Sequence, residues 1–165
     1  MLDSADRFHL SAAIGWVGLG NWREANEELE KITPALRSHA EVLSVRYEIY
    51  AMAGKWDGAA DLALVLRDGQ PASAERWIKL AYATRRKPEG GGVVEAQKIL
   101  HEASERFLNE AIIFYNLACY ACQLGDLKGA ATLLEKAFGM GDAKQLKLMA
   151  LDDSDLEPLW AAIRA

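Results

Sequence analysis

The sequence has few of the features that mark secreted or membrane proteins. Its 165 residues include two cysteines, Cys119 and Cys122, too few for the disulfide framework of a small secreted domain. No apolar run approaches the ~18–20 residues that cross a membrane, and residues 1–6 are acidic where a signal peptide needs a basic segment. We therefore expect a soluble, cytoplasmic protein.

Positive charge is not in excess either. Aspartate and glutamate number 24 against 19 lysines and arginines, which gives a net charge of −5, and the basic residues are mostly dispersed. A protein that binds DNA or RNA through the phosphate backbone needs a basic surface, so we do not expect nucleic acid as a partner. Apolar residues make up 51% of the chain, which is enough for a continuous core.

What the sequence does contain is an internal repeat. The turn Gly20-Asn21-Trp22 recurs 34 residues later as Gly54-Lys55-Trp56, and a third copy begins at Gly125. In each copy an alanine follows the glycine by five residues, and counting back 34 residues from the third copy adds one more. These alanines are Ala25, Ala59, Ala96 and Ala130. A small residue at a fixed place is expected where two helices cross closely, and a period of this length is typical of helical repeat arrays.

Apolar periodicity, interrupted by the glycine turns, predicts about ten helices and no strand. The expected ranges are 4–18, 22–33, 39–53, 56–68, 73–86, 92–106, 110–124, 127–139, 143–150 and 155–163. The third unit is longer than the others by three residues, and the segment 85–92, which contains Pro88 and three glycines, is where its first helix has to stop.

The stretch Phe114–Ala131 closely resembles a tetratricopeptide repeat. Its leading aromatic is followed three residues later by Leu117 and a small residue, and a Gly-Asp turn at Gly125 leads to Ala130. The segment Tyr115–Trp160 also resembles the ending of many bacterial tetratricopeptide proteins. The resemblance implies a single all-α domain, 1–165, that forms a right-handed superhelix. Its four helix-turn-helix repeats are expected at about 5–38, 39–72, 73–109 and 110–142, with a C-terminal helical cap over 143–165.

The resemblance also implies a function, that of a non-catalytic scaffold or adaptor in protein–protein interaction. In this family the first helix of each repeat lines the concave face of the superhelix. The positions selected by that mapping are Leu10, Ile14, Glu41, Ser44, Glu48, Ala51, Ile78, Tyr82, Arg85, Tyr115, Asn116, Cys119 and Cys122. Such a groove is mixed apolar and aromatic with a few charges, so we expect a protein or peptide partner with apolar anchors.

Two other functions stay open. Arg85 and Arg86 precede the glycine-rich segment, so the chain could be an accessory or regulatory domain that binds a small acidic ligand there. It could also be a homo-oligomerisation module that uses an exposed repeat face. The clamp with which some family members grip a C-terminal carboxylate is not predicted. Leu10, Ile14 and Val45 stand where the clamp has polar residues, and Lys79 alone remains.

Neither a catalytic site nor a metal site is predicted. Cys119 and Cys122 have the spacing of a redox or metal motif, but both lie well inside an expected helix, whereas a reactive thiol is activated at a helix N-terminus. The histidines, His9, His39 and His101, fall in different repeats, and no second cysteine pair exists. We therefore expect no enzymatic activity and no cofactor.

The last segment of the chain is predicted to cover the apolar face of the fourth repeat, which has no following repeat to pack on. Apolar residues within 156–163 recur at i, i+3, i+4 and i+7 and form one side of an expected helix. Ser154 or Asp155 is expected to cap the start of that helix. The acidic residues of this segment are expected to face water.

Overall fold

The computed structural model describes residues 2–164, which form α-helices and short 3-10 helices and contain no strand. This confirms the all-α fold that the periodicity predicts. The first part of the array consists of α1 (Ser4–Gly18), α2 (Trp22–Lys31), the 3-10 helix η1 (Pro34–Leu36), α3 (Ala40–Met52), α4 (Trp56–Gly69) and α5 (Ala74–Arg86). The second part consists of α6 (Val93–Arg106), α7 (Ala111–Gln123), α8 (Leu127–Met140), α9 (Ala143–Asp152), the 3-10 helix η2 (Ser154–Leu159) and α10 (Trp160–Arg164).

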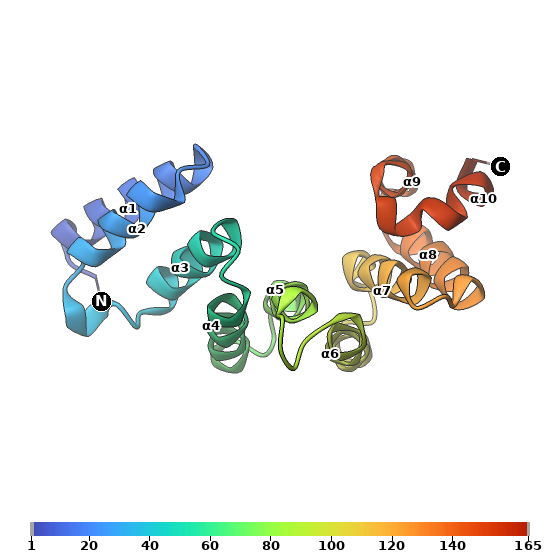
Figure 1. The fold of residues 1–165 in the computed structure, drawn as a ribbon, viewed down its shortest axis with the longest axis horizontal. Helices are drawn as coiled ribbons and strands as arrows, with labels where there is room; N and C mark the ends of the chain where they lie inside the picture. The colour runs from blue at the N-terminus through green and yellow to red at the C-terminus, as the bar shows by residue number, and fades with distance from the viewer. Residues whose placement is uncertain (1, 165) are drawn as a thin grey trace.

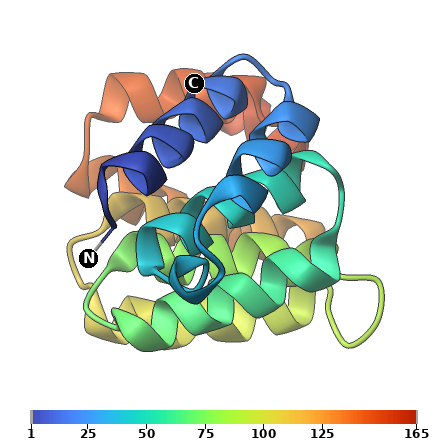
Figure 2. The same cartoon turned by 90° about the vertical axis from the view of Figure 1, so that its left-hand side faces the viewer.

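The helices pack in consecutive pairs, α1 with α2, α3 with α4, α5 with α6 and α7 with α8. Successive pairs lie side by side, and the array bends so that the first pair and the C-terminal elements rise on the same side (Figure 1). Seen from the N-terminal end, the pairs stack behind one another (Figure 2). We call α1, α3, α5 and α7, the first helices of the pairs, the inner helices.

Glycine makes the turn within three of the four pairs. Gly20, Gly54 and Gly125 have φ values of +76°, +68° and +85°, a left-handed conformation that costs an L-residue with a side chain roughly 1–2 kcal/mol. The turn of the third pair is longer and takes its left-handed residues from Gly90 and Gly92. The recurrence of glycine in the sequence therefore reflects a backbone requirement of the tight turn.

The four repeated alanines are completely buried. Ala25, Ala59, Ala96 and Ala130 lie near the starts of α2, α4, α6 and α8, and each has 0% exposure. A larger side chain at such a place would hold the two helices of a pair apart. Their burial is what the expected crossing role requires.

The core is divided along the array into three clusters of buried side chains. The N-terminal cluster centres on Leu29 and Val42, the middle cluster includes Tyr47 and Leu66, and the C-terminal cluster extends from Trp77 to Leu159. Each cluster is formed by neighbouring helices, as in a solenoid whose units contact only their neighbours. The C-terminal cluster includes residues of α9 and η2, which therefore cover the last pair.

The end of the chain differs from the expected single helix over 155–163. It forms the six-residue 3-10 helix η2 followed by the short α10, and Pro158 lies inside η2. Proline has no N–H with which to continue an α-helical ladder, which accounts for the break. The N-cap is Asp153, whose side chain accepts a hydrogen bond from the backbone N–H of Asp155, and not Ser154 or Asp155 as expected.

Candidate functional site

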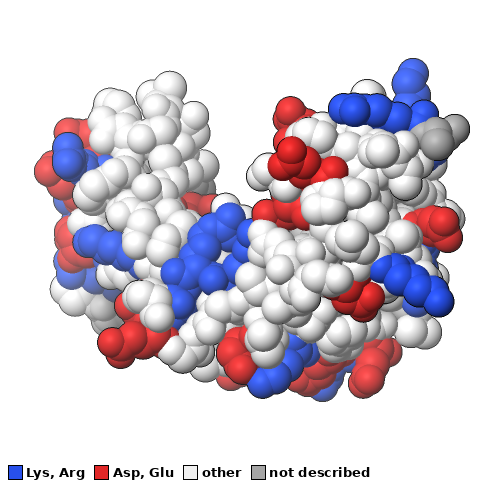
Figure 3. Space-filling model, turned by 45° about the vertical axis from the view of Figure 1, so that its right-hand side comes forward, with Lys and Arg blue, Asp and Glu red and all other residues white. Residues whose placement is uncertain are grey.

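The bend of the array leaves a hollow between its two arms. Figure 3 shows this hollow, with lysine and arginine gathered at its floor and aspartate and glutamate on the wall formed by the C-terminal arm. Part of the hollow is a cavity of about 180 Å³ against the inner helices α1, α3 and α5. It is lined by Ile14, Val17, Ser44, Val45, Glu48 and Lys79. We call this hollow the concave groove.

Lys79 is the charged centre of the open part of the groove. Its Nζ atom lies 2.9 Å from a carboxylate oxygen of Glu48 on α3 and 2.6 Å from one of Glu75, one turn earlier on α5. Burial on its own lowers the pKa of Lys79, but the hydrogen bonds with the two glutamates outweigh it and hold the pKa above its usual value. The ammonium group therefore remains charged and joins α3 to α5.

The expected groove residues of α1 and α3 differ in their exposure. Ile14 is 53% exposed and lies on the wall of the cavity, whereas Leu10, one turn earlier, is 5% exposed and belongs to the N-terminal core. Ser44 is half-buried; its hydroxyl donates to the Ala40 carbonyl at 2.8 Å and accepts from Arg76 Nη1 at 2.9 Å. Of these residues, Ile14 offers the largest apolar contact to a partner.

On α5 the expected residues have three different surroundings. Ile78 is half-buried and packs against the C-terminal core. Tyr82 is 41% exposed, and its ring packs edge-on against Trp56 with 5.9 Å between the ring centroids. The guanidinium of Arg86 lies 3.6 Å from the centroid of the Tyr82 ring. The guanidinium of Arg85 lies 5.4 Å from the Tyr120 ring centroid on α7. Tyr82 and Arg86 thus form an exposed aromatic-cationic edge.

The expected residues of α7 are covered by the chain itself. Tyr115 is 4% exposed and Cys119 is 2% exposed, because residues 153–159, which we call the C-terminal turn, lie across them. The hydroxyl of Tyr115 donates to Asp153 Oδ2 at 3.0 Å, and the Cys119 thiol donates to the same oxygen at 3.5 Å. Asn116 is half-buried and donates from Nδ2 to the Ile112 carbonyl of its own helix at 2.8 Å.

Two acidic residues of the C-terminal turn face the groove, although the sequence predicts that they face water. Asp153 binds α7, as described above. Asp155 accepts hydrogen bonds from Nη1 and Nη2 of Arg85 at 2.5 and 3.0 Å and a further one from Gln123. The side chains of Arg85 and Asp155 are 20% and 19% exposed. A planar guanidinium matches a carboxylate in this two-bond geometry, so the expected acidic ligand of Arg85 is supplied by the chain.

Cys119, Asp153 and Asp155 bring a thiol and two carboxylates within 4.8 Å of one another. Their hydrogen bonds define what this cluster does. Burial, and then the charge of Asp153, raise the pKa of the Cys119 thiol well above its usual range, so the sulfur keeps its proton and acts as a donor. The carboxylate of Asp155 is already paired with the guanidinium of Arg85. This arrangement holds the C-terminal turn against α5 and α7 and gives neither a thiolate nor free carboxylates for a metal ion.

Comparison with protein-family models and with curated proteins gives no match for the chain. Solved structures do match. A thermophilic TPR protein of Thermus thermophilus, TTC0263, superposes with a TM-score of 0.71 at 17% identity over 96% of this chain and 83% of that one. MamA from Desulfovibrio magneticus RS-1 gives 0.71 at 15% identity, covering 82% and 75%, and MamA of MSR-1 gives 0.68 at 21% identity, covering 84% and 78%.

This chain has the tetratricopeptide-repeat fold. In this structure the cavity of the concave groove lies against the inner helices α1, α3 and α5. No helix among residues 2–164 is both long and apolar enough to cross a membrane.

Val17, Val45 and Lys79 line the groove of this tetratricopeptide-repeat fold but are not among the groove positions selected from the sequence. Val17 lies three residues after Ile14 on the same helix, so helical periodicity could have found it. In the sequence Lys79 stands out only as the remnant of a carboxylate clamp, and its pairing with Glu48 identifies it as a bridge between inner helices. No pattern in the sequence indicates that Asp153 and Asp155 face the groove, because their partners lie in the repeats and far from them in the sequence.

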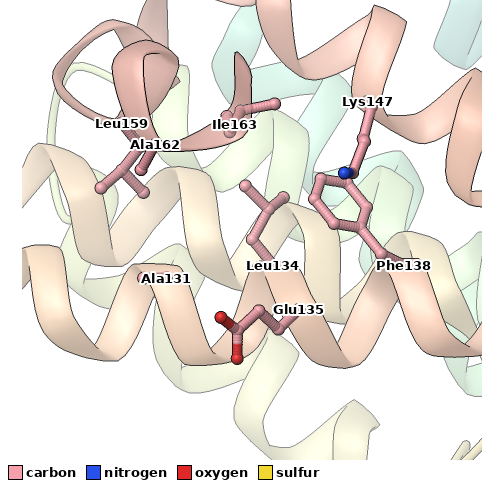
Figure 4. A pocket seen from close by; sticks show the side chains of 8 residues that line it. All are labelled: Ala131, Leu134, Glu135, Phe138, Lys147, Leu159, Ala162 and Ile163. Atoms are coloured by element: carbon pink, nitrogen blue, oxygen red, sulfur yellow. The ribbon is translucent and has the colours of Figure 1, made fainter. Parts of the chain in front are cut away.

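A second hollow of about 160 Å³ lies at the C-terminal end of the repeat fold, between α8 and the cap. Figure 4 shows Leu134 and Phe138 of α8 facing the stretch of chain that carries Leu159 and Ile163, with Lys147 above the Phe138 ring. The Nζ atom of Lys147 lies 5.8 Å from the centroid of that ring. This hollow is small and mostly apolar, with Glu135 and Lys147 also lining it, and it belongs to the packing of the cap on α8.

Proposed function

We propose that the chain is a non-catalytic scaffold or adaptor that binds a protein or peptide partner in the concave groove, on α1, α3 and α5. The observation that supports this most is that large side chains on the groove side of α1 and α5 are exposed and do not pack into the core. Ile14 remains 53% exposed beside the cavity, and Tyr82 remains 41% exposed on α5, three residues after Lys79 and so on the same side of that helix.

The chemistry of the open groove fits a peptide with apolar anchors and at least one polar side chain. Val17 and Val45 extend the apolar surface around Ile14, while Glu48 and Lys79 offer an acceptor and a donor next to it. In such a site apolar anchors provide most of the binding free energy and the polar groups fix orientation. Similarity to solved tetratricopeptide-repeat proteins supports protein binding in general.

The proposal is tested by two groove variants and two controls matched in exposure. Ile14→Ala and Tyr82→Ala remove groove side chains, while Val94→Ala and Leu64→Ala remove side chains of similar exposure, 50% and 42%, from the second helices α6 and α4. Affinity capture from the native host, followed by a binding measurement with each captured protein, should show loss only with the groove variants.

Two results would contradict the groove proposal. Equal binding by the groove variants and the controls would place the partner on another face. If the controls lose binding while the groove variants keep it, the second helices form the interface. Sedimentation of the purified chain tests the alternative of a homo-oligomerisation module: a self-association that Leu64→Ala or Val94→Ala abolishes would favour that function.

A further inference from the structure

The C-terminal turn occupies the α5–α7 half of the concave groove in the way that a peptide ligand would. Side chains that point into the groove from two different repeats, Arg85 and Tyr115, converge on it, and both bind carboxylates of one short segment. The segment is distant in sequence from Arg85, because Arg85 and Asp155 are 70 positions apart. It therefore contacts Arg85 and Tyr115 from outside the four repeats, while its leucines also belong to the C-terminal core.

From this contact we propose that the α5–α7 half of the groove is a binding subsite for a partner segment with the pattern Asp-x-Asp-Leu-x-x-Leu, which the chain's own C-terminal turn occupies until the partner displaces it. The inference rests on the proposed function, because it names the chemistry of a partner for the same groove.

The carboxylate spacing in the pattern follows from the positions of the donors. Asp155 takes both guanidinium bonds of Arg85, and Asp153, two residues earlier, takes the bonds of Tyr115 and Cys119. A guanidinium held in a fixed orientation binds a carboxylate selectively, because its paired N–H groups match the two carboxylate oxygens. Arg85 is held in that way, with Tyr120 beneath it and 20% of its side chain exposed.

The apolar part of the pattern comes from two leucines of the same turn. Leu156 is completely buried and Leu159 is 8% exposed, and both belong to the C-terminal core. They follow Asp155 by one and four residues, so the turn presents its carboxylates to α5 and α7 and its leucines to the core. A partner that replaces the turn has to supply both kinds of contact, which is why the pattern has four fixed positions.

The location of the turn makes its displacement possible without unfolding the repeats. It lies at the end of the array, where local opening costs least, and η2 is a 3-10 helix with poorer hydrogen-bond geometry than an α-helix. The α7–α8 pair also packs on α6 through contacts that do not involve the turn, so we expect that packing to remain when the turn leaves. Because the turn is tethered, it competes with an effective concentration of roughly millimolar, so weak or unmatched segments are excluded.

The test uses a fluorescein-labelled peptide of residues 151–160 and measures its binding to the full chain by anisotropy. Asp153→Asn with Asp155→Asn weakens the tethered turn, so this variant should bind the peptide about tenfold more tightly than the wild type, or better, since each lost bond is to a charged group. Adding Arg85→Gln should remove the gain. The control Asp152→Asn with Glu157→Gln makes the same change of charge at two exposed residues and should behave as the wild type.

A second measurement keeps the inference testable if the double variant fails to fold. Native-state hydrogen exchange of the wild type should show the amides of η2 and α10 opening while α7 and α8 stay protected. Exchange of these amides only with global unfolding overturns the inference, as does a folded variant that binds the peptide no more tightly than the wild type. If the variant instead forms a dimer that does not bind the peptide, the occupant of the subsite is the turn of a second copy and not a segment of another protein.

These outcomes are separate from those of the proposed function. Ile14 lies on α1 beside the open cavity, and Tyr82 packs on Trp56 of α4, so their alanine variants report on the open half of the groove. Loss of a partner in those variants, combined with no peptide binding in the double variant, would leave the groove proposal standing and remove only the subsite.

Discussion

Replacing Ala130 by leucine adds three carbon atoms at a position that has no exposed surface. If the site had room, burying them would stabilise the protein by roughly 2.4 kcal/mol, at ~0.8 kcal/mol for each carbon. Protein interiors are packed as densely as organic crystals, so the added atoms instead push side chains from their rotamers or move α8 away from α7. The net cost of such overpacking is about 1–3 kcal/mol.

The assay is urea and thermal unfolding followed by circular dichroism at a helix band. For a chain of this length each kcal/mol lowers the melting temperature by about 3 °C, so Ala130→Leu should melt about 3–9 °C below the wild type. Ala59→Leu, at the equivalent place in the second pair, should behave in the same way because Ala59 is also completely buried. Thr132→Leu serves as the control, since Thr132 is exposed on the same helix as Ala130.

The reasoning fails if the two alanine variants unfold at the same midpoint as the wild type while remaining helical. That result would mean that the helix pairs have room at these positions, and the alanine would then lose its explanation as a crossing residue. Destabilisation by Thr132→Leu of similar size would also refute it, because the effect would come from adding leucine to α8 and not from the crossing.

Three further predictions concern the C-terminal half. Leu156→Ala should destabilise by about 2–5 kcal/mol in urea unfolding, because Leu156 is completely buried, whereas Leu148→Ala, at 62% exposure, should change the midpoint by no more than about 0.5 kcal/mol. The Cys119 thiol should react with a disulfide reagent at pH 8 far more slowly in the native protein than after unfolding, since burial raises its pKa; native and unfolded rates that agree would contradict this. Burial raises the pKa of Tyr120 from 10.0 to about 12. The unfolded chain then loses this proton first, so the contribution to stability is complete below pH 10 and declines as the pH rises from 10 to 12. Tyr120→Phe should make that decline less steep in unfolding measurements, and Tyr47 and Tyr115, whose pKa values burial also raises, account for what remains.

The helical architecture was predictable because its determinants are local. A glycine with positive φ is required at each tight turn, and an alanine is required near the start of each second helix; both requirements recur at a fixed distance along the chain. The first nine expected helix ranges differ from the observed helices by no more than two residues at either end. Helix periodicity and turn residues are read within one repeat, and no knowledge of the other repeats is needed.

The C-terminal cap was predicted only in part, for reasons that concern the backbone. Leu156 and Leu159 are buried as the apolar pattern indicates, and Trp160 donates from Nε1 to the Ala150 carbonyl at 2.9 Å. The pattern does not distinguish an α-helix from a 3-10 helix followed by a short α-helix over so few residues. Pro158 breaks the α-helical ladder here, but proline is also common in the first turn of an ordinary α-helix, so its presence alone does not decide between the two.

The distribution of exposed and covered groove residues depends on contacts between the repeats and the C-terminal turn, which no single repeat encodes. The C-terminal turn follows α9, which packs on α8, and from there it reaches Arg85 of α5 and Tyr115 of α7. The mapping selected both Tyr82 and Tyr115 as groove residues, because both belong to inner helices, yet Tyr115 is 4% exposed and Tyr82 is 41% exposed. What separates them is Asp153, which reaches α7 but not the open edge of α5. A repeat alignment therefore selects candidate groove residues, and the contacts between repeats and cap decide which of them stay exposed.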